Sequence, residues 1–534
     1  MNILLRLIFT SNSRIGGGCM LVIRNLTIKT NNQRVLIDKL NFTCLTSDKI
    51  AIIGEEGNGK STLLKGIADP SWVCDFASIE GSISYGNDVI GYLEQFLPKQ
   101  WHLCSVMDYL LLDYPTDTLD VEKYGLLNEI YMCCAQIGIE LELLDRESMC
   151  QLSGGEKVKI QLLKLLLKQP DLLLLDEPTN DLDIETLEWL ETFILQQKIP
   201  VLFISHDETL LEHCANGILH LEQIVRKTKP KWTFERIGYL EYLEKREDLH
   251  TRQNRLAKEE KRAHDMQMEK YRRIYNAVDH AQATISRQNP HGGQLLKKKM
   301  KSVKAMERRF ENKELTQKVD VEEAITLYFH DTVSLDKNKM VLAYQLNELR
   351  IEDKILSKSI TLDVYGQDKV VIIGKNGCGK TTLLKKIYEE LKHRTDIKVG
   401  YMPQNYDELL DMSKSGLEFL CRDKKKETIT KVQKHMGSVK FTSDEMMMPI
   451  SNYSQGQKAK LLLVDMVLKE VNVLLLDEPT RNLSPLSNPV IRDILCNFKG
   501  CIISVSHDRK YIAEVSDVVY RLDETGLWQE KTSL

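Results

Sequence analysis

Short apolar runs mark matching places in the two halves of the chain. Lys49–Ile53 and Lys369–Ile373 each lead into a Gly-rich stretch, whereas Leu172–Leu175 and Val473–Leu476 each end in Asp-Glu-Pro-Thr. Continuous apolar runs of this length are typical of strands that are buried on both faces of a parallel sheet. Leu- and Lys-rich sequence with helical character follows each Gly-rich stretch, so the pattern predicts α/β domains built from strand–loop–helix units.

The same motifs occur twice at constant spacing. The Ser of a Gly-rich motif lies 24 residues before a Glu in both halves, and that Glu lies 29 residues before a His. Each motif position recurs 301 residues later: Ser153 as Ser454, Glu177 as Glu478, and His206 as His507. A shared offset across three motifs indicates an internal duplication of one domain.

Two Gly-rich loops have the phosphate-binding pattern Gly-x-x-x-x-Gly-Lys-[Ser/Thr]. Glycines let backbone N–H groups approach phosphate oxygens closely, and the Lys adds positive charge. A chance Gly-rich turn is the alternative, but two copies with matching downstream motifs count against it. The nucleotide-binding residues are therefore expected to be Gly54, Glu55, Glu56, Gly57, Asn58, Gly59, Lys60, Ser61 and Thr62, and Gly374, Lys375, Asn376, Gly377, Cys378, Gly379, Lys380, Thr381 and Thr382.

Magnesium is the metal expected beside the phosphates. Carboxylates at the ends of buried parallel strands lie where open α/β sheets bind their ligands. Hydroxyl, carboxylate and amide oxygens suit this ion, directly or through water. The expected ligands are Ser61, Gln95 and Asp176 in the first copy, and Thr381, Gln404 and Asp477 in the second.

The remaining acid and the His of each copy are the candidate catalytic residues. Glu177 and Glu478 are expected to orient and polarise an attacking water, and His206 and His507 to contact the γ-phosphate. A structural role is the alternative for either His, but matched spacing in both copies favours the catalytic role.

These motifs resemble the ATP-binding cassette superfamily, and the resemblance covers almost all of residues 20–528. It implies that the chain hydrolyses ATP and that the two cassettes pair head to tail. Each ATP then lies between one phosphate loop and the signature motif of the other cassette. The resemblance places Ser454 and Gly456 against the nucleotide held by Lys60. It places Ser153, Gly154 and Gly155 against the nucleotide held by Lys380.

The chain departs from the family pattern in three places. The second signature has Tyr453 and Gln455 in place of the usual Leu and Gly, and Ser484 replaces the Asp that the first copy has at Asp183. The two ATP sites are therefore expected to differ in rate. The aromatic residue that usually stacks on adenine is missing near Thr30 and Ile351, so ATP itself rests on the resemblance.

Composition suits a cytoplasmic multidomain protein. The 534 residues carry a formal net charge of −4, and 28% of them are charged. No stretch approaches the roughly 20 apolar residues of a membrane span. The 12 cysteines have no regular spacing, which indicates reduced residues rather than a disulfide or metal framework. Residues 1–19 are expected to be a disordered extension or a misassigned start before Met20.

Charge concentrates between the two repeats. Thr251–Phe310 contains 16 Lys and Arg against 6 Asp and Glu, a balance of +10. Helix-forming residues dominate this region and predict two antiparallel helices with an exposed turn near Val278–Gly293. The expected seam uses an apolar stripe on each helix: Leu249, Leu256 and Ala263 on the first, and Leu296, Met300, Val303 and Phe310 on the second.

A rod with this charge is a candidate RNA-binding element, although a solvated spacer is the alternative. Basic side chains fit phosphate backbones, and aromatic residues can stack on unpaired bases. Tyr271, Tyr275 and His280 lie among the basic residues. The expected RNA-binding residues are Arg272, Arg273, Arg287, Lys297, Lys298 and Lys299.

Two fused cassettes with such a linker resemble the ABC-F family. This implies a monomer with cassettes at 20–234 and 326–534 and a basic hairpin at 235–325. Its partner is then the 70S ribosome, through ribosomal RNA and P-site tRNA, with no membrane partner. The motif gaps leave little room for an arm insertion, which favours the branch that protects ribosomes from pleuromutilin, lincosamide and streptogramin A antibiotics. The alternatives are a housekeeping ABC-F translation factor, a duplicated sugar-importer ATPase subunit, and a DNA-associated ATPase.

Overall fold

The computed structural model divides the chain into two compact units. One contains Met1–Tyr239 and Glu322–Leu534, and the other contains Leu240–Val321. The described residues are 19–85, 89–117, 125–224, 229–284, 290–311, 327–329, 334–352, 354–421, 423 and 425–530. The predicted extension at residues 1–19 lies outside this range except for Cys19.

The first repeat folds around a six-stranded sheet in the order β5-β6-β7-β3-β8-β9. All neighbouring strands pair in parallel except β8 and β9. A second, antiparallel sheet has the order β2-β1-β4. The strands are β1 (Cys19–Thr30), β2 (Val35–Leu45), β3 (Lys49–Ile53), β4 (Ala77–Ser84), β5 (Ile90–Leu93), β6 (Leu172–Asp176), β7 (Val201–Ile204), β8 (Gly217–Gln223) and β9 (Lys229–Glu235).

The second repeat has the same sheet order. Its six strands run β13-β14-β15-β12-β16-β17, again parallel except for the last pair, and β10 and β11 form a separate antiparallel hairpin. This repetition confirms the predicted duplication of an α/β domain. The strands are β10 (Met340–Ile351), β11 (Lys354–Tyr365), β12 (Lys369–Ile373), β13 (Val399–Met402), β14 (Val473–Asp477), β15 (Cys501–Val505), β16 (Val518–Leu522) and β17 (Leu527–Glu530).

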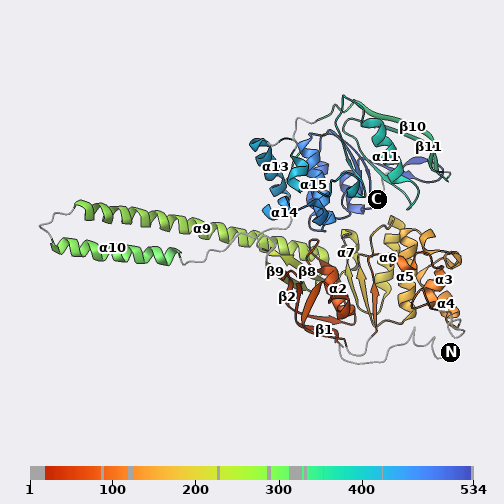
Figure 1. Ribbon diagram of the computed structural model, residues 1–534, viewed down its shortest axis with the longest axis horizontal. Helices are drawn as coiled ribbons and strands as arrows, with labels where there is room; N and C mark the ends of the chain where they lie inside the picture. The colour runs from red at the N-terminus through yellow and green to blue at the C-terminus, as the bar shows by residue number, and fades with distance from the viewer. Residues whose placement is uncertain are drawn as a thin grey trace. The chain divides into compact units, whose positions relative to one another are not determined.

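Helices cover the sheets of both repeats (Figure 1). In the first repeat they are α2 (Lys60–Ala68), α3 (Val106–Leu111), α4 (Leu127–Ile137), α5 (Gly154–Leu167), α6 (Ile184–Gln196) and α7 (Glu208–Cys214). In the second they are α11 (Lys380–Leu391), α12 (Gly416–Leu420), α13 (Lys426–Ser438), α14 (Ser443–Met447), α15 (Gln455–Leu468), α16 (Asn488–Cys496) and α17 (Arg509–Val515).

The central strands are buried because they pack on both faces, as their apolar runs predict. Every residue of β6 and β14 is buried. One core joins β3 and β6 to α2 and the antiparallel sheet, and another joins α3, α4 and α5. The apolar runs of β6 and β14 therefore each end at one edge of the sheet, and the Asp that follows each run lies next to the phosphate loop.

The smaller unit consists mainly of α9 (Tyr239–Thr284) and α10 (Pro290–Glu311), which Figure 1 shows alongside each other. At about 1.5 Å per residue, α9 is on the order of 70 Å long. Pro290 begins α10, where a missing N–H is tolerated, so the predicted turn at Val278–Gly293 is too long. The interval between the helices, residues 285–289, lies outside the described range, as does Arg287.

The predicted seam is right for the described side chains of α10, which do not include Phe310. On α9 it is wrong for Leu249 and Leu256, whereas Ala263 is half-buried. On α10, Val303 is buried and Leu296 and Met300 are half-buried. On α9, Leu249 and Leu256 are 55% and 47% exposed, whereas Ala257 and Tyr271 are buried. The buried stripe of α9 therefore lies one position after the predicted heptad.

Candidate active sites

Each phosphate loop folds between a buried strand and the helix that follows it. Gly54 and Gly374 have φ values of 143° and 151°. A Cβ at Gly54 would lie 2.2 Å from the Leu221 carbonyl oxygen, and one at Gly374 would lie 2.3 Å from that of Leu522. Only glycine fits there, because the loop is pressed against the neighbouring strand while its backbone is in the left-handed region.

The lysine of each loop is folded back over the loop. Lys60 Nζ donates to the carbonyl oxygens of Gly54 and Glu55 at 2.8 and 3.0 Å. Lys380 Nζ makes the equivalent bonds to Gly374 and Lys375 at 2.7 and 2.9 Å. Both ammonium groups therefore lie at the centre of the loop, where backbone N–H groups and a helix N-terminus favour an anion.

The strand-end acids lie beside the hydroxyls that follow these lysines. Ser61 Oγ donates to Asp176 Oδ1 at 2.9 Å, and Tyr92 donates to Asp176 Oδ2 at 3.0 Å. In the second copy, Asp477 Oδ2 is buried and has no hydrogen-bond partner among the described residues. A divalent cation would satisfy this oxygen, so the oxygen-rich donor set fits magnesium.

Glu177 and Glu478 share an unusual backbone conformation. Their φ values are 49° and 52°, in the left-handed region that is costly for residues with a Cβ. Both follow the last residue of a buried strand, and their N–H groups donate to the carbonyl oxygens of Ile204 and Val505. The same strained turn in both copies aims both carboxylates out of the sheet edge.

The surroundings of these two carboxylates differ. Glu177 accepts hydrogen bonds from Gln95 Nε2 at 2.7 Å and Asn180 Nδ2 at 2.8 Å, and its Oε1 lies 3.2 Å from His206 Nε2. Glu478 Oε1 lies 3.8 Å from His507 Nε2. Neither ring nitrogen of His507 has a hydrogen-bond partner among the described residues.

The charge states follow from these contacts. Burial raises the pKa of Glu177, but His206, Asn180 and Lys60 outweigh it and lower that pKa to about 2. Burial and the neighbouring Asp477 carboxylate raise the pKa of Glu478 to about 8. Burial, with the Lys380 ammonium, lowers the pKa of His507 to about 3. The two copies thus present an ionised and a largely protonated carboxyl group near neutral pH.

The signature motif of each repeat lies against the phosphate loop of the other. Gly456 N donates to Glu56 Oε2 at 2.7 Å, and Lys460 Nζ lies 3.7 Å from Glu55 Oε1. Gly154 lines a cavity of about 410 Å³ together with Gly377 and Lys380. The structure thus brings Gly456 to the first phosphate loop and Gly154 to the second.

The same cavity contains most of the predicted residues of the second site. Thr381, Gln404, Asp477, Glu478 and His507 line it, together with His206 from the first repeat. Ile351 and Leu356 also line it, at the place where an adenine-stacking aromatic was missing from the sequence. Aliphatic side chains there offer packing area but no ring to stack.

Each signature Ser caps the helix that follows it. Ser153 lies directly before α5 and Ser454 directly before α15, and each forms a capping box with the residue three positions later, Glu156 or Gln457. The first residue of the second signature, Tyr453, is buried and donates to the Glu445 carbonyl oxygen at 2.6 Å. The Tyr at this position, where the family has Leu, therefore takes part in the packing of the helical region.

The helix that follows Ser484 begins later than its counterpart in the first copy. Asp183 accepts a hydrogen bond from Thr186 N at 3.0 Å and begins α6 directly after itself. Ser484 instead lies 3.1 Å from Ser487 Oγ, and α16 begins only at Asn488. Ser caps helices as well as Asp does, so the later start follows from Pro489, which is tolerated in the first turn of α16 but would lack the N–H needed inside a longer helix.

Two contacts between the repeats were not anticipated from the sequence. Arg481 Nη1 lies 2.8 Å from Asp181 Oδ1, and His206 Nδ1 lies 2.7 Å from the Leu483 carbonyl oxygen. Arg481 occupies the position where the first repeat has Asn180. Comparing the repeats at the 301-residue offset would have marked it as a charge present in only one copy.

The candidate RNA-binding residues form a separate group. Arg272 and Arg273 on α9 and Lys297, Lys298 and Lys299 on α10 are all exposed. Tyr271 is buried, whereas Tyr275 is half-buried. Tyr271 therefore packs within the unit and is not available for stacking on a base, which corrects that part of the prediction.

Comparison with known proteins identifies the duplicated domain. Residues 37–180 and 357–481 match the family described as ABC transporter. None of the helices in the described residues has the length and apolar character needed to cross a membrane.

Similar proteins share both cassettes. The chain is 30% identical to the ATP-binding protein Uup of Buchnera aphidicola subsp. Schizaphis graminum, covering 90% of this chain and 77% of that protein. It is 26% identical to the ABC transporter F family member 5 of Arabidopsis thaliana, with 89% and 71% covered. A crystal structure of archaeal ribosome recycling factor aABCE1 with ribosomal stalk protein aP1 shares the fold, with a TM-score of 0.57, 16% identity, and 94% and 89% covered.

The two family matches cover 144 and 125 residues, about half of the 534. Together with relatives that match across both cassettes, they show that the chain is an ATP hydrolase belonging to the ABC-F family of tandem ATP-binding cassette proteins.

Proposed function

We propose that the chain binds ribosomes and uses ATP binding and hydrolysis to act on translation. The observation that carries this proposal is the unit of two helices between two complete cassettes, with its basic excess concentrated in Thr251–Phe310. In its described part, every Lys and Arg from Arg252 to Lys304 is exposed. Such a surface suits a phosphate backbone more than a protein or lipid surface of mixed charge. Membership of the ABC-F family supports the same conclusion.

The cassettes supply the energy for this action. Bound ATP is held by the phosphate loop of one cassette and by the signature Gly of the other, which draws the two cassettes together. Asp176 and Asp477, with Ser61 and Thr381, would hold magnesium, which would neutralise charge on the phosphates. Glu177 and Glu478 orient the attacking water, and His206 and His507 fix the end of the phosphate chain. Loss of the γ-phosphate then weakens the contact between the cassettes.

The beginning of α9 provides a path from the ATP sites to the linker. Tyr239 is buried, and its hydroxyl donates to the Pro485 carbonyl oxygen at 3.5 Å. Pro485 directly follows Leu483 and Ser484, and Leu483 contacts His206. A change in the distance between the cassettes therefore moves the residue from which the linker starts.

Ribosome binding is expected to depend on the basic residues of the linker. A chain with Arg272, Arg273, Lys297, Lys298 and Lys299 all changed to Ala should bind at least about tenfold more weakly at physiological salt. Its affinity should also depend less on salt, because each phosphate contact contributes about 0.7–0.9 to the slope of log affinity against log salt. Co-sedimentation with 70S ribosomes, with ATP and a salt series, measures both quantities.

The matched control removes acidic charge from the same helix. Asp265 and Asp279 are exposed on α9, and changing both to Ala should leave binding equal or stronger. Equal weakening in the acidic and basic variants would show that the helices act through their fold rather than their charge. If the unmodified chain never sediments with ribosomes, the proposed partner is wrong.

The finer proposal is protection of ribosomes against antibiotics that bind the peptidyl-transferase centre. The interval between α9 and α10, with Thr284 and residues 285–288, is the part that we propose approaches that centre. Its replacement by a short Gly-Ser linker should preserve ribosome binding, since the basic helices remain. It should abolish rescue of in vitro translation inhibited by a pleuromutilin or a lincosamide. Full rescue by the deleted protein would contradict this role, and no rescue by the unmodified protein would favour a housekeeping translation factor.

A further inference from the structure

Two helices from each cassette meet in a network of ion pairs beside the ATP sites. Helices α7 and α17, which follow the Ser-His-Asp motifs, pack on each other. Arg492 of α16 makes two hydrogen bonds to Glu208 of α7, at 2.5 and 3.1 Å. Both side chains are only 3% exposed. This pair joins the second cassette to the first through groups that water barely reaches.

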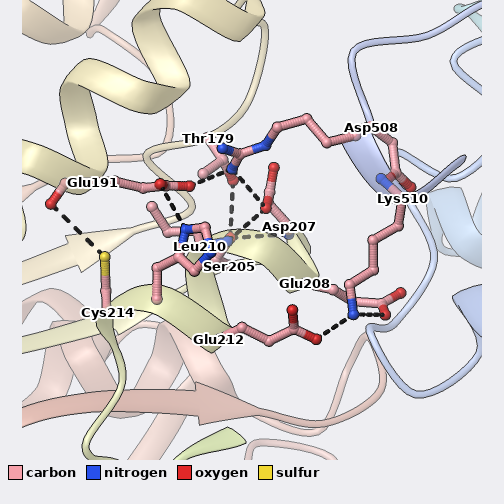
Figure 2. Close-up of polar contacts among 12 residues, drawn as sticks. Thr179, Glu191, Ser205, Asp207, Glu208, Leu210, Glu212, Cys214, Asp508 and Lys510 are labelled. Atoms are coloured by element: carbon pink, nitrogen blue, oxygen red, sulfur yellow. Dashed lines mark hydrogen bonds and ion pairs between the residues drawn. The ribbon is translucent and has the colours of Figure 1, made fainter. Parts of the chain in front are cut away.

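A second ion pair joins the other two helices, α17 of the second cassette and α6 of the first. Arg509 of α17 pairs with Glu191 of α6, and its guanidinium lies 3.5 Å from Asp207 Oδ1. Lys510 pairs with Glu212 and lies 3.4 Å from Glu208 Oε2. Figure 2 shows Lys510, from the second cassette, reaching the carboxylates of Glu208 and Glu212. Every acid in these contacts comes from the first cassette, and every base comes from the second.

The internal repeat relates these pairs to each other. At the 301-residue offset, Glu191 corresponds to Arg492, and Glu208 corresponds to Arg509. The Glu191–Arg509 and Arg492–Glu208 pairs are therefore the same contact made twice about a pseudo-twofold axis, with its charges exchanged.

The supporting contacts within each cassette are exchanged in the same way. Glu191 lies 2.9 Å from His213 Nδ1, and Arg492 lies 2.7 Å from Glu514 Oε2. His213 and Glu514 also correspond at the 301-residue offset. The inversion thus includes the groups that hold each interface residue in place, and it extends beyond two isolated positions.

The exchanged charges make a first cassette complementary to a second cassette. At the same interface, two first cassettes or two second cassettes would repel each other. If two copies of the first cassette paired in this geometry, Glu191 would face Glu208 twice. Two second cassettes would place Arg492 against Arg509 twice. Like charges opposed in a dehydrated interface are strongly unfavourable, and such opposition is how interfaces exclude wrong partners.

We propose that this charge-inverted network selects the cassette partner, so that a first cassette pairs with a second cassette and not with a like cassette of another copy. The Gly and Lys residues of the phosphate loops and the signature Ser occur in both cassettes and do not make this distinction. Exclusion of like pairs leaves the second cassette as the partner that completes the ATP sites of the first. This inference depends on the family fold and does not depend on the proposed ribosomal partner.

Exchanging the charges tests the proposal in the full chain. The Glu191→Arg/Glu208→Arg variant makes both sides basic, and the Arg492→Glu/Arg509→Glu variant makes both acidic. Each should lose at least about tenfold of ATP turnover, because like charges then oppose closure. The chain with all four substitutions restores opposite charges and should recover turnover to within about threefold of the unmodified protein.

A control variant and a set of Gln substitutions test the same network with smaller changes in charge. Lys398 and Glu470 form an exposed ion pair within the second cassette, and Lys398→Glu should leave turnover unchanged. Glu208→Gln and Arg492→Gln should each lower the thermal midpoint, because each leaves a buried charge without its partner. The Glu208→Gln/Arg492→Gln chain should be destabilised by less than the sum of the two single changes.

Two results would overturn the proposal. The first is a variant with only one side exchanged that retains normal turnover. The second is a set in which the four-substitution chain is no more active than either double variant, and the Glu208→Gln/Arg492→Gln chain is destabilised by the full sum of its two single changes.

Discussion

The Glu177→Gln/Glu478→Gln variant is expected to bind ATP normally and to hydrolyse it about 10²–10⁴-fold more slowly. Gln keeps the size of the side chain but removes the carboxyl group that orients water, which is ionised at Glu177. Each Glu directly follows a fully buried strand and has a left-handed φ, so its position is fixed by the fold, and the neighbouring Asp176 or Asp477 is assigned to magnesium. Phosphate release under saturating ATP measures the loss, and fluorescent-nucleotide binding verifies that ATP still binds.

The control changes two exposed glutamates in the same domains. Glu188 on α6 and Glu427 on α13 are exposed, and the Glu188→Gln/Glu427→Gln chain should retain normal turnover. Near-normal hydrolysis in the Glu177→Gln/Glu478→Gln chain would reject these residues as the water-positioning groups.

The corresponding single variants should differ from each other in residual turnover. Glu177 has hydrogen bonds from Gln95 and Asn180 and a nearby His206, whereas Glu478 is buried with a raised pKa. Substitution with Gln therefore removes an ionised group in one copy and a largely neutral group in the other. Equal losses in the two single variants would show that the differences between the copies have no effect on rate.

The buried strands and the phosphate loops could be predicted from the sequence because local rules determine them. A continuous run such as Leu172–Leu175 has one favourable environment, and the loop pattern requires glycine where a Cβ would strike the next strand. Their spacing then places the acid and the His at the same sheet edge. None of this depends on how the two cassettes meet.

The linker register could not be predicted because its helices contain few apolar residues. Leu249 and Leu256 form a plausible heptad, yet both are exposed, and Ala257 and Tyr271 are buried instead. In a helix with a mostly polar sequence, one or two contacts with the neighbouring helix decide which face is covered. Those contacts are long-range and do not appear in the local pattern.

Contacts between the cassettes were also beyond the local sequence pattern, and only the family resemblance placed Gly456 near the first phosphate loop. Glu56 lies in a predicted nucleotide loop, but its hydrogen bond to Gly456 N connects residues 400 positions apart. The inverted charges at Glu208 and Arg509 are visible at the 301-residue offset only when the helices are known to face each other. The sequence therefore identifies the candidate site residues within each cassette, whereas the structure shows which residues of the two cassettes meet.

The Gly456→Asp substitution is expected to lower ATP turnover about 10²-fold while leaving both cassettes folded. A Cβ at Gly456 would lie 2.7 Å from the Asn482 carbonyl oxygen and 3.0 Å from Glu56 Oε2. The added carboxylate would also oppose Glu56 and the phosphates that Lys60 attracts. Loss of one positioned N–H donor to a developing negative charge typically costs about 10²–10³-fold.

A matched substitution separates this local effect from a general one. Gly437 on α13 is exposed, and a Cβ there meets no other atom within 4 Å. Gly437→Asp should therefore retain turnover. Nucleotide binding should persist in the Gly456→Asp chain, because the Lys60 loop belongs to the other cassette. If that chain kept normal turnover with an unchanged thermal midpoint, the second signature would not act on the ATP held by the first loop, and the head-to-tail site would be wrong.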